Sequence, residues 1–544
     1  MCGIFALLNN DKFSQVTVNE QFIKGQSRGP EFSKLELSID HIQLGFHRLA
    51  INGLNEQSNQ PFDIDNIVLV CNGEIYNYKN LYEMMNINPT TGSDCEIIIH
   101  LYIKYGIQQT LTMLDGVFSF VLFDRTKRHV YVARDPLGVR PLYFYEGLYT
   151  DSCNYIYGFA SELKCLDHFY NHTDHSRVID QFTPGTYSMF TTVKDVFVLS
   201  KMNVPYYIPS FSNPSMKVDF KSAIQTSLLD AVNKRCCTTE RPIACLLSGG
   251  LDSSLIAALV NNYYNITGQQ NKLETYSIGL KESEDLKYAR KVAEYLGTQH
   301  TEIVVTEEEM FESIPDVVRA IESYDTTSIR ASIGNYLIGK YISTHSPAKV
   351  IFNGDGSDEL FGGYLYMNKC PDDIEFDKET RRLLKDIHLF DVLRSDKCIS
   401  SHGLEPRTPF LDKTFVNTVL LLSPTIRNHN HLQSNRIEKY ILRESFSDYN
   451  DIYNKPILPS EILWRKKEAF SDGVSSQGRS LFTILQERIA RQLNMEPTIE
   501  TEKKYYSNLF DEYYPNCRNV IPYFWMPKYT DATDPSARTL DIYA

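Results

Sequence analysis

The sequence predicts two domains, a first built from short β-strands and a second in which strands alternate with helices. With 544 residues, the chain exceeds the roughly 250 to 300 residues at which a single hydrophobic core stops growing. Hydrophobic residues make up 42% of it, which is enough for two full cores. The segment 203–216 has three prolines and no amphipathic period, as linkers do. We therefore place the first domain at 1–200, the linker at 201–216 and the second domain at 217–544.

The first domain is expected to consist mainly of strands, because its apolar runs are short and are separated by Gly, Pro and Asn turns. One helix is predicted over 94–105, where a longer segment rich in apolar residues is not interrupted by turn residues. The clearest predicted strands are 43–50, 67–71, 117–124 and 129–133.

In the second domain, predicted strands and helices alternate along the chain. The strands are expected at 243–247, 275–278 and 350–352, and the helices at 253–262, 286–296 and 307–324. This alternation favours a parallel sheet covered by helices. The C-terminal end is rich in Tyr and Pro and is expected to be irregular.

Composition excludes several classes of function. A net charge of −13 argues against broad nucleic-acid binding but leaves room for a local basic pocket that binds a small anion. The eleven cysteines show no paired C-x-x-C spacing, so neither a disulfide framework nor a structural zinc site is expected. No apolar run approaches the ~18 residues of a membrane helix, and the chain start does not read as a signal peptide. We expect a cytoplasmic protein with no membrane partner, and the sequence leaves its oligomeric state open, with a homodimer as one option.

The strongest chemical signal is the run SGGLDSS at 248–254, which follows a predicted strand and opens a helix. Two glycines allow close approach of the backbone to a ligand, and free N–H groups at a helix start attract an anion. The pattern lacks the lysine of a Walker loop, so an ordinary kinase or ATPase loop is not predicted. The simpler alternative is a strand-to-helix turn capped by Asp252.

A second signal lies at the chain start, where Cys2 follows Met1. Removal of Met1 would give one residue both a thiol and a free α-amino group, which can act together as nucleophile and base. Alone, such a cysteine is more often a small buried hydrophobic residue. If Met1 stays in place, the amine is lost and this chemistry is not expected.

Several motifs of the second domain resemble known enzymes. SGGLDSS is similar to the pyrophosphate-binding loop of the ATP pyrophosphatases. NGDGSDELFGGY at 353–364 resembles a segment of the glutamine-dependent asparagine synthetases. The runs YDTTSIRAS at 324–332, EPRTPFLD at 405–412 and WRKKEAFSDG at 464–473 resemble the same family and occur in its order.

The first domain resembles the glutaminase domain of the N-terminal-nucleophile amidotransferases. The similar runs are GFHRLA, CNGEIYN, TGSDCE, LDGVFSFVLFD and ARDPLGVRPLYF. Together the two resemblances imply an α+β first domain with four αββα layers and antiparallel sheets. They imply an α/β second domain with a doubly wound parallel sheet and a pyrophosphate-binding loop.

The resemblance implies roles for residues of the first domain in glutamine hydrolysis. Cys2 would attack the side-chain amide, while Asn72 and the Gly73 N–H would stabilise the tetrahedral oxyanion. Arg48 would bind the α-carboxylate and Asp94 the α-ammonium group of glutamine. Glu74, in the same motif, is also expected at this site.

For the second domain the resemblance implies an ATP site with Mg²⁺. Asp252 and Asp358 are the candidate Mg²⁺ ligands, since this ion favours one or two carboxylates together with phosphate oxygens. Lys467 is expected near the α-phosphate, and Thr327, Ser328 and Arg330 at pyrophosphate and substrate. Leu246 and Ile278 could line the adenine pocket or belong to the core. The remaining residues expected around the nucleotide are Ser248, Gly249, Gly250, Ser253, Ser254, Asn353 and Gly354.

This chain departs from the family pattern at two places. Where the family commonly has Ser-Gly-Glu-Gly, it has Asn353-Gly354-Asp355-Gly356, so the acid expected to take protons from ammonia is one methylene shorter. We hypothesise that Asp355 still serves as this base, through a small shift or a water, with a possible cost in rate. The other departure is Glu31, where the family usually has Asp, and only a structural adjustment is expected there.

The implied reaction converts aspartate, ATP and glutamine to asparagine, AMP, pyrophosphate and glutamate through a β-aspartyl-AMP intermediate. Ammonia would pass between the domains along an enclosed path lined by small and apolar residues, because water would protonate it. The sequence does not identify the residues of this path.

Four alternatives were weighed against this interpretation. A β-lactam synthetase shares both domains but lacks a working N-terminal cysteine. A phosphoribosyl or hexosamine-phosphate amidotransferase would share only the first domain and would not explain SGGLDSS. An ammonia-dependent synthetase with an inactive glutaminase would be indifferent to replacement of Cys2. A non-catalytic homologue would bind ATP or aspartate without releasing pyrophosphate.

Overall fold

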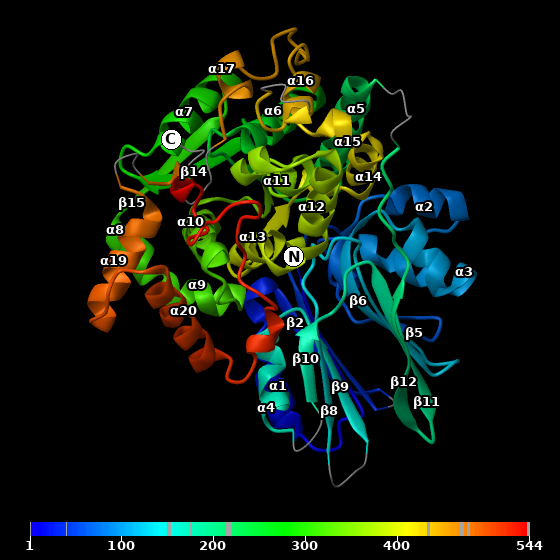
Figure 1. Ribbon diagram of the computed structural model, residues 1–544. Helices are drawn as coiled ribbons and strands as arrows, with labels where there is room; N and C mark the ends of the chain where they lie inside the picture. The colour runs from blue at the N-terminus through cyan, green and yellow to red at the C-terminus, as the bar shows by residue number, and fades with distance from the viewer. Residues whose placement is uncertain are drawn as a thin grey trace.

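The computed structural model describes residues 2–39, 41–149, 154–173, 177–213, 219–431, 436–467, 473–475 and 479–540. Its first domain contains two sheets, and the second domain contains a third sheet surrounded by helices (Figure 1). No helix among these residues has the length and apolar character needed to cross a bilayer.

The first domain is built from two six-stranded antiparallel sheets, as expected. In one sheet the strand order is β10-β8-β9-β1-β3-β2, with β1 (Gly3–Leu8) near its centre. Its other strands are β2 (Phe32–Ile39), β3 (Ile42–Arg48), β8 (Tyr143–Leu148), β9 (Tyr155–Ala160) and β10 (Arg177–Gln181). The other sheet has the order β12-β11-β7-β6-β5-β4. It consists of β4 (Phe62–Ile64), β5 (Ile67–Ile75), β6 (Gly116–Asp124), β7 (His129–Arg134), β11 (Thr186–Val193) and β12 (Val196–Pro205).

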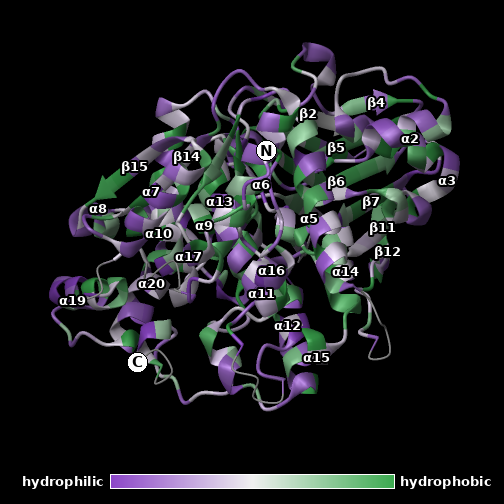
Figure 2. Ribbon diagram, turned by 90° about the horizontal axis from the view of Figure 1, so that it is seen from above, coloured by the Kyte–Doolittle hydropathy of each residue, from purple (hydrophilic) through white to green (hydrophobic). Residues whose placement is uncertain are grey.

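The two sheets stack face to face and are covered by helices on their outer faces. Alternate side chains of β1 and β3 meet those of β5, β6 and β7 in one buried apolar cluster. Helices α2 (Tyr78–Met85) and α3 (Ile97–Met113) cover the second sheet, while α1 (Gln15–Ile23) and α4 (Asp167–Asn171) cover the first. Figure 2 shows β6 as hydrophobic along most of its length, as a strand buried on both faces requires. The four αββα layers are therefore confirmed.

The second domain is a doubly wound α/β fold around a five-stranded parallel sheet with the order β15-β14-β13-β16-β17. Its strands are β13 (Ile243–Leu246), β14 (Glu274–Leu280), β15 (Gln299–Val305), β16 (Val350–Phe352) and β17 (Glu405–Arg407). One face carries α5 (Phe220–Cys237), α6 (Leu251–Thr267) and α7 (Glu284–Leu296). The other carries α9 (Ile314–Ile321), α10 (Thr326–His345) and α13 (Asp391–Ser400). The strand order reverses between β13 and β16, which is where open parallel sheets bind ligands.

The observed elements differ from the sequence prediction at four places. The helix predicted over 307–324 is broken at Ser313 into α8 (Glu307–Glu312) and α9. The helix predicted over 94–105 begins as a short 3₁₀ turn, Asp94–Glu96, and continues as α3, which is kinked at Gly106 (φ +75°), directly after the predicted end, before it runs on to Met113. Strand β12 extends to Pro205, so 201–205 of the predicted linker belong to the second sheet; 214–216 lie outside the described residues. Within the C-terminal end, α20 (Ile499–Tyr513) is regular and the described chain after it contains only short 3₁₀ turns.

Candidate active site

The first candidate site surrounds Cys2, which lies directly before β1 and is half-buried. Its backbone N–H donates to Asn72 Oδ1 at 3.2 Å, and its Sγ lies 3.8 Å from the Leu49 carbonyl oxygen. Burial raises the pKa of the Cys2 thiol. The thiol is therefore mainly protonated near neutral pH, so attack on a carbonyl requires a nearby base.

Asn72 and Gly73 occupy neighbouring positions on β5 and lie beside the nucleophile. The Asn72 side chain is fully buried, and its Nδ2 donates to Ser161 Oγ at 3.4 Å. Gly73 packs against β6 so closely that an added Cβ would lie 2.7 Å from the Val117 carbonyl oxygen. A side chain is thus excluded at Gly73, and the strand holds the Asn72 amide against the Cys2 backbone.

The charged residues predicted for glutamine binding are all buried, with different partners. Arg48, the last residue of β3, donates to Asn59 Oδ1 at 2.7 Å and to the carbonyl oxygens of Asn52, Gly53 and Asn55. Asp94 accepts the Ile75 N–H at 2.6 Å, and burial raises its pKa to about 6.

Glu74 points toward the second domain. Its carboxylate accepts from Asn52 Nδ2 at 2.8 Å and lies 3.3 Å from the Arg407 guanidinium. The predicted contact of this side chain with glutamine would therefore require it to leave an ion pair between the domains.

The second candidate site is a cavity at the carboxyl ends of β13, β14 and β16, at the point where the strand order reverses. It brings together most of the residues predicted for the synthetase site, from segments far apart in the sequence. The predicted residues that line it are Leu246, Ser248, Gly250, Asp252, Ser253, Ile278, Thr327, Asn353, Gly354, Asp355, Asp358 and Lys467.

The loop between β13 and α6 has the form expected of an anion-binding turn. Ser248 Oγ and Ser253 Oγ lie 3.0 Å apart and close the turn, and α6 begins after Gly250 with its first N–H groups free of helical partners. Gly249 has φ +75° and packs against α7, where an added Cβ would lie 2.5 Å from the Ala289 nitrogen. Gly249 and Ser254 are not among the residues that line the cavity, and Ser254 is fully buried, so their contacts with a ligand stay a prediction.

A cluster of opposite charges, formed by Asp252 of this loop with Asp358, Lys439 and Lys467, lines the same cavity. Lys439 Nζ contacts Asp252 Oδ2 at 2.5 Å and Asp358 Oδ1 at 2.6 Å, while Lys467 Nζ contacts the other Asp358 oxygen. Burial acts to raise the pKa of Asp358, but the two ammonium groups hold it well below its ordinary value. Two ionised carboxylates that converge on one cation are a suitable donor set for Mg²⁺, which would complete its shell with phosphate oxygens and water.

Thr327, Ser328 and Arg330 lie in the first turns of α10 but point in different directions. Thr327 lines the main cavity and a smaller one beside it, which Ser328 also lines. Arg330 lines neither of these cavities, because its guanidinium is bound to Glu502 and Asp534 at 2.5 to 2.9 Å. A direct contact of Arg330 with pyrophosphate would require these buried ion pairs to break.

The smaller cavity contains a buried carboxyl group with an open acceptor. Tyr364 OH donates to Glu359 Oε1 at 2.5 Å, whereas Glu359 Oε2 has no hydrogen-bond partner within the described part of the chain. Burial raises the pKa of Glu359 well above its ordinary value. Asp391 lines both cavities, and Arg394 lines the main one. At the junction of the two cavities, one cationic group (Arg394) and two acidic groups (Glu359 and Asp391) are placed to contact a small zwitterion.

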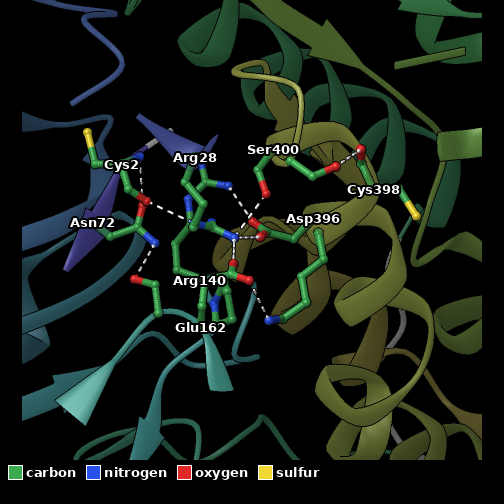
Figure 3. Close-up of polar contacts among 12 residues, drawn as sticks. Cys2, Arg28, Asn72, Arg140, Glu162, Asp396, Cys398 and Ser400 are labelled. Atoms are coloured by element: carbon green, nitrogen blue, oxygen red, sulfur yellow. Dashed lines mark hydrogen bonds and ion pairs between the residues drawn. The ribbon is translucent and has the colours of Figure 1, made fainter. Parts of the chain in front are cut away.

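Buried ion pairs connect the two sites across the domain interface (Figure 3). Arg28 Nε donates to the Cys2 carbonyl oxygen at 3.0 Å, and its Nη1 contacts Glu162 at 2.7 Å and Asp396 at 2.8 Å. Arg140 adds a second contact with Asp396 at 3.3 Å. Because Asp396 belongs to α13, this helix is linked through Arg28 to the backbone of Cys2 and also lines the cavity of the second domain through Arg394.

Sequence reasoning missed several residues of the second site. Arg394 and Asp391 belong to α13. Lys439 directly precedes α16 (Tyr440–Ser445), and Arg443 lies within it. The spacing of these residues in the sequence gives no recognisable signal. Arg465 and Lys466 also line the cavity and lie inside the run WRKKEAFSDG, in which the family resemblance indicates only Lys467. Residues 468–472 of that run lie outside the described residues.

Comparison with known proteins assigns both domains. Residues 1–201 match the family model described as a glutamine amidotransferase domain. Residues 223–373 and 369–525 match the model described as asparagine synthase. The chain belongs to the asparagine synthetase family.

Relatives within the asparagine synthetase family are similar over the whole chain. The glutamine-hydrolysing asparagine synthetase of Gallus gallus is 39% identical over 573 residues, which cover 100% of this chain and 99% of the relative. That of Homo sapiens is 39% identical over 572 residues, and that of Mus musculus 38% over 576, with the same coverage. Membership of the family confirms the resemblance drawn from the sequence motifs.

Proposed function

We propose that this protein is a glutamine-hydrolysing asparagine synthetase, an ATP-dependent carbon–nitrogen ligase. It converts L-aspartate, L-glutamine, ATP and water to L-asparagine, L-glutamate, AMP and diphosphate through β-aspartyl-AMP. The observation that carries this proposal is the single cavity that gathers the loop 248–253, the Asp358–Lys467 pair and Asp355. Full-length similarity to synthetases of that name supports the same reaction.

In the first domain, Cys2 attacks the amide of glutamine with its own free amine as the base. The Asn72 side chain and the Gly73 N–H stabilise the oxyanion, ammonia leaves, and water hydrolyses the thioester. Arg48 and Asp94 hold the α-carboxylate and the α-ammonium group of glutamine. Glu74 contributes by supporting this pocket from the interface.

Glutamine binding is expected to weaken as the pH falls through about 6, because burial raises the pKa of Asp94 to about 6. Above this pH the carboxylate is ionised and attracts the ammonium group, whereas below it the protonated group does not. In the Cys2→Ala variant, which binds without turnover, calorimetry should show Kd rising about tenfold per pH unit below this value. Asp94→Asn in the Cys2→Ala background should bind glutamine weakly at every pH. If Kd for glutamine in the Cys2→Ala variant that keeps Asp94 did not depend on pH, this would contradict the role of Asp94.

In the second domain, ATP binds with its phosphates at the loop 248–253 and its adenine between Leu246 and Ile278. Lys467 neutralises charge at the α-phosphate while diphosphate leaves. Mg²⁺, held by Asp252 and Asp358, supplies Lewis-acid stabilisation of the phosphate oxygens when bound. Lys439, which contacts both carboxylates, would balance part of their negative charge.

Aspartate fits the junction of the two cavities. Thr327 and Ser328 line this junction, the acidic groups Glu359 and Asp391 suit the α-ammonium group, and Arg394 suits the α-carboxylate. The β-carboxylate would then face the nucleotide. Asp355 lines the same cavity and takes a proton from ammonia as it attacks the adenylate.

Ammonia passes from Cys2 to Asp355 through the buried interface beside α13. Ion pairs of Arg28, Arg140 and Glu74 lie at the described interface, and the small and apolar lining of the path stays a prediction of the sequence. A cytoplasmic location, a homodimer and the absence of a nucleic-acid partner stay predictions of the sequence.

An end-point assay with Mg-ATP and aspartate tests the proposed reaction. Asparagine and diphosphate are quantified with glutamine or with ammonium as nitrogen donor, and equal amounts of both products are expected with either. Asparagine from ammonium alone would favour an ammonia-dependent enzyme with an inactive glutaminase. No diphosphate with either donor would favour a non-catalytic homologue.

A further inference from the structure

The Asn353 side chain makes two hydrogen bonds, one to the backbone of Asp355 and one to a serine of helix α13. The residue follows β16 directly and is 4% exposed. Its Oδ1 accepts the Asp355 backbone N–H at 3.3 Å, and its Nδ2 donates to Ser395 Oγ at 2.7 Å. One side chain thus connects the backbone of Asp355 to helix α13.

The same helix contacts the Asp355 carboxyl group. Arg394 Nη2 lies 3.6 Å from Asp355 Oδ1. Burial raises the pKa of Asp355, while Arg394 and, to a smaller extent, Ser395 act to lower it. A serine hydroxyl has one proton to donate. Because Ser395 Oγ accepts from the Asn353 amide, its own proton stays available to the neighbouring Asp355 carboxylate.

We propose that Asn353 is a positioning residue, which sets the location of the Asp355 carboxylate and the orientation of Ser395 beside it. This inference rests on the proposed function, in which Asp355 accepts a proton from ammonia. An aspartate reaches one methylene less far than a glutamate, so its carboxylate depends more strongly on where the backbone is held. The longer side chain at 353 and the shorter acid at 355 therefore act as one matched pair.

The charged surroundings of Asp355 do not differ between the variants that test this pair. The groups that face its carboxyl are Arg394 and Asp391 of α13 and Asp358 of α11 (Ser357–Phe361). None of them bonds to the Asn353 side chain. A change at 353 therefore acts through position and hydrogen bonding rather than through a new charge.

The test compares Asn353→Ser, Asp355→Glu and the double variant with the unaltered enzyme, using ammonium as nitrogen donor. For Asn353→Ser we expect kcat for asparagine to fall about 10- to 100-fold, since a shift near 1 Å can cost that much. The single-turnover burst of diphosphate should fall much less than kcat for asparagine, so the ratio of asparagine to diphosphate falls. Asp355→Glu alone should also lose activity, and the double variant should recover most of it, because the two positions are coupled.

Ser395→Ala provides a second probe that removes only one hydroxyl group. Ser395→Ala should lower the ratio of asparagine to diphosphate. When it is combined with Asn353→Ser, this ratio should fall little further. Ser401→Ala, at the C-cap of the same helix, is the matched control, because within the described residues its hydroxyl bonds only to the Cys398 carbonyl oxygen of its own helix.

Two results would overturn the inference while leaving the proposed function intact. One is a normal ratio and rate in both Asn353→Ser and Ser395→Ala. The other is a double variant no better than Asp355→Glu alone. If the unaltered enzyme formed no asparagine from ammonium, the proposed function itself would fail, so the two failures are distinguishable.

Discussion

Cys2→Ala is expected to abolish asparagine formation from glutamine while leaving formation from ammonium unchanged. The substitution removes the only proposed nucleophile, and the loss should be at least about 1,000-fold, as for other covalent catalysts. Cys2 lies at the edge of β1 and is half-buried, so replacement by alanine leaves the sheets intact. Glutamate and asparagine are measured together with each donor, after mass spectrometry has verified that Met1 is absent.

Cys237→Ala is the matched control for this experiment, because Cys237 is an exposed free cysteine at the end of α5. It should retain both activities. Persistent glutamine-dependent synthesis in Cys2→Ala would contradict the assignment of the nucleophile. Loss of the ammonium-dependent reaction as well would show that Cys2 in the first domain is also needed for the synthetase reaction of the second domain.

Lys467→Met is expected to lower diphosphate release by about 100- to 1,000-fold with either nitrogen donor, the effect of removing one group that stabilises charge in a transition state. Burial acts to lower the pKa of Lys467, but Asp358 and Asp252 raise it above its ordinary value, so the ammonium is charged throughout the physiological range. Asp358 keeps Lys439 as a partner in the variant, so the fold is expected to survive. Diphosphate in a single turnover is the direct measurement.

Lys455→Met is the control, because Lys455 is an exposed lysine that bonds to the Tyr295 carbonyl oxygen outside the cavity. It should release diphosphate at the normal rate. If Lys467→Met changed only the KM for aspartate, Lys467 would be a substrate-binding residue rather than a group that stabilises the departing diphosphate.

The elements that place the second site could be predicted because the relevant loops follow parallel strands. Asn353 comes directly after a short apolar strand and Ser248 two residues after another, and the carboxyl ends of such strands meet at one edge of a sheet. Cys2 and Asn72 could be brought together only through the family resemblance. No local pattern indicates that β5 of one sheet lies against the start of β1 in the other.

The residues that sequence reasoning misplaced or missed depend on long-range contacts. The direction of Arg330 is fixed by Glu502 and Asp534, which are 172 and 204 positions away along the chain. Lys439 reaches Asp252 from 187 positions away, and its position before α16 gives no hint of this. Such ion pairs leave no periodic trace in a sequence, whereas strands and phosphate-binding turns do.

An isotope competition tests most directly the central claim that one chain hydrolyses glutamine and delivers its nitrogen to an activated aspartate. The enzyme is supplied with Mg-ATP, aspartate and glutamine labelled with ¹⁵N in the side-chain amide, together with excess unlabelled ammonium at neutral pH, where Asp94 is ionised and most of the ammonium stays protonated. We predict asparagine that carries mainly ¹⁵N, in amounts equal to glutamate and diphosphate. Asparagine with the isotope content of the ammonium pool, or glutamate formed without asparagine, would contradict it.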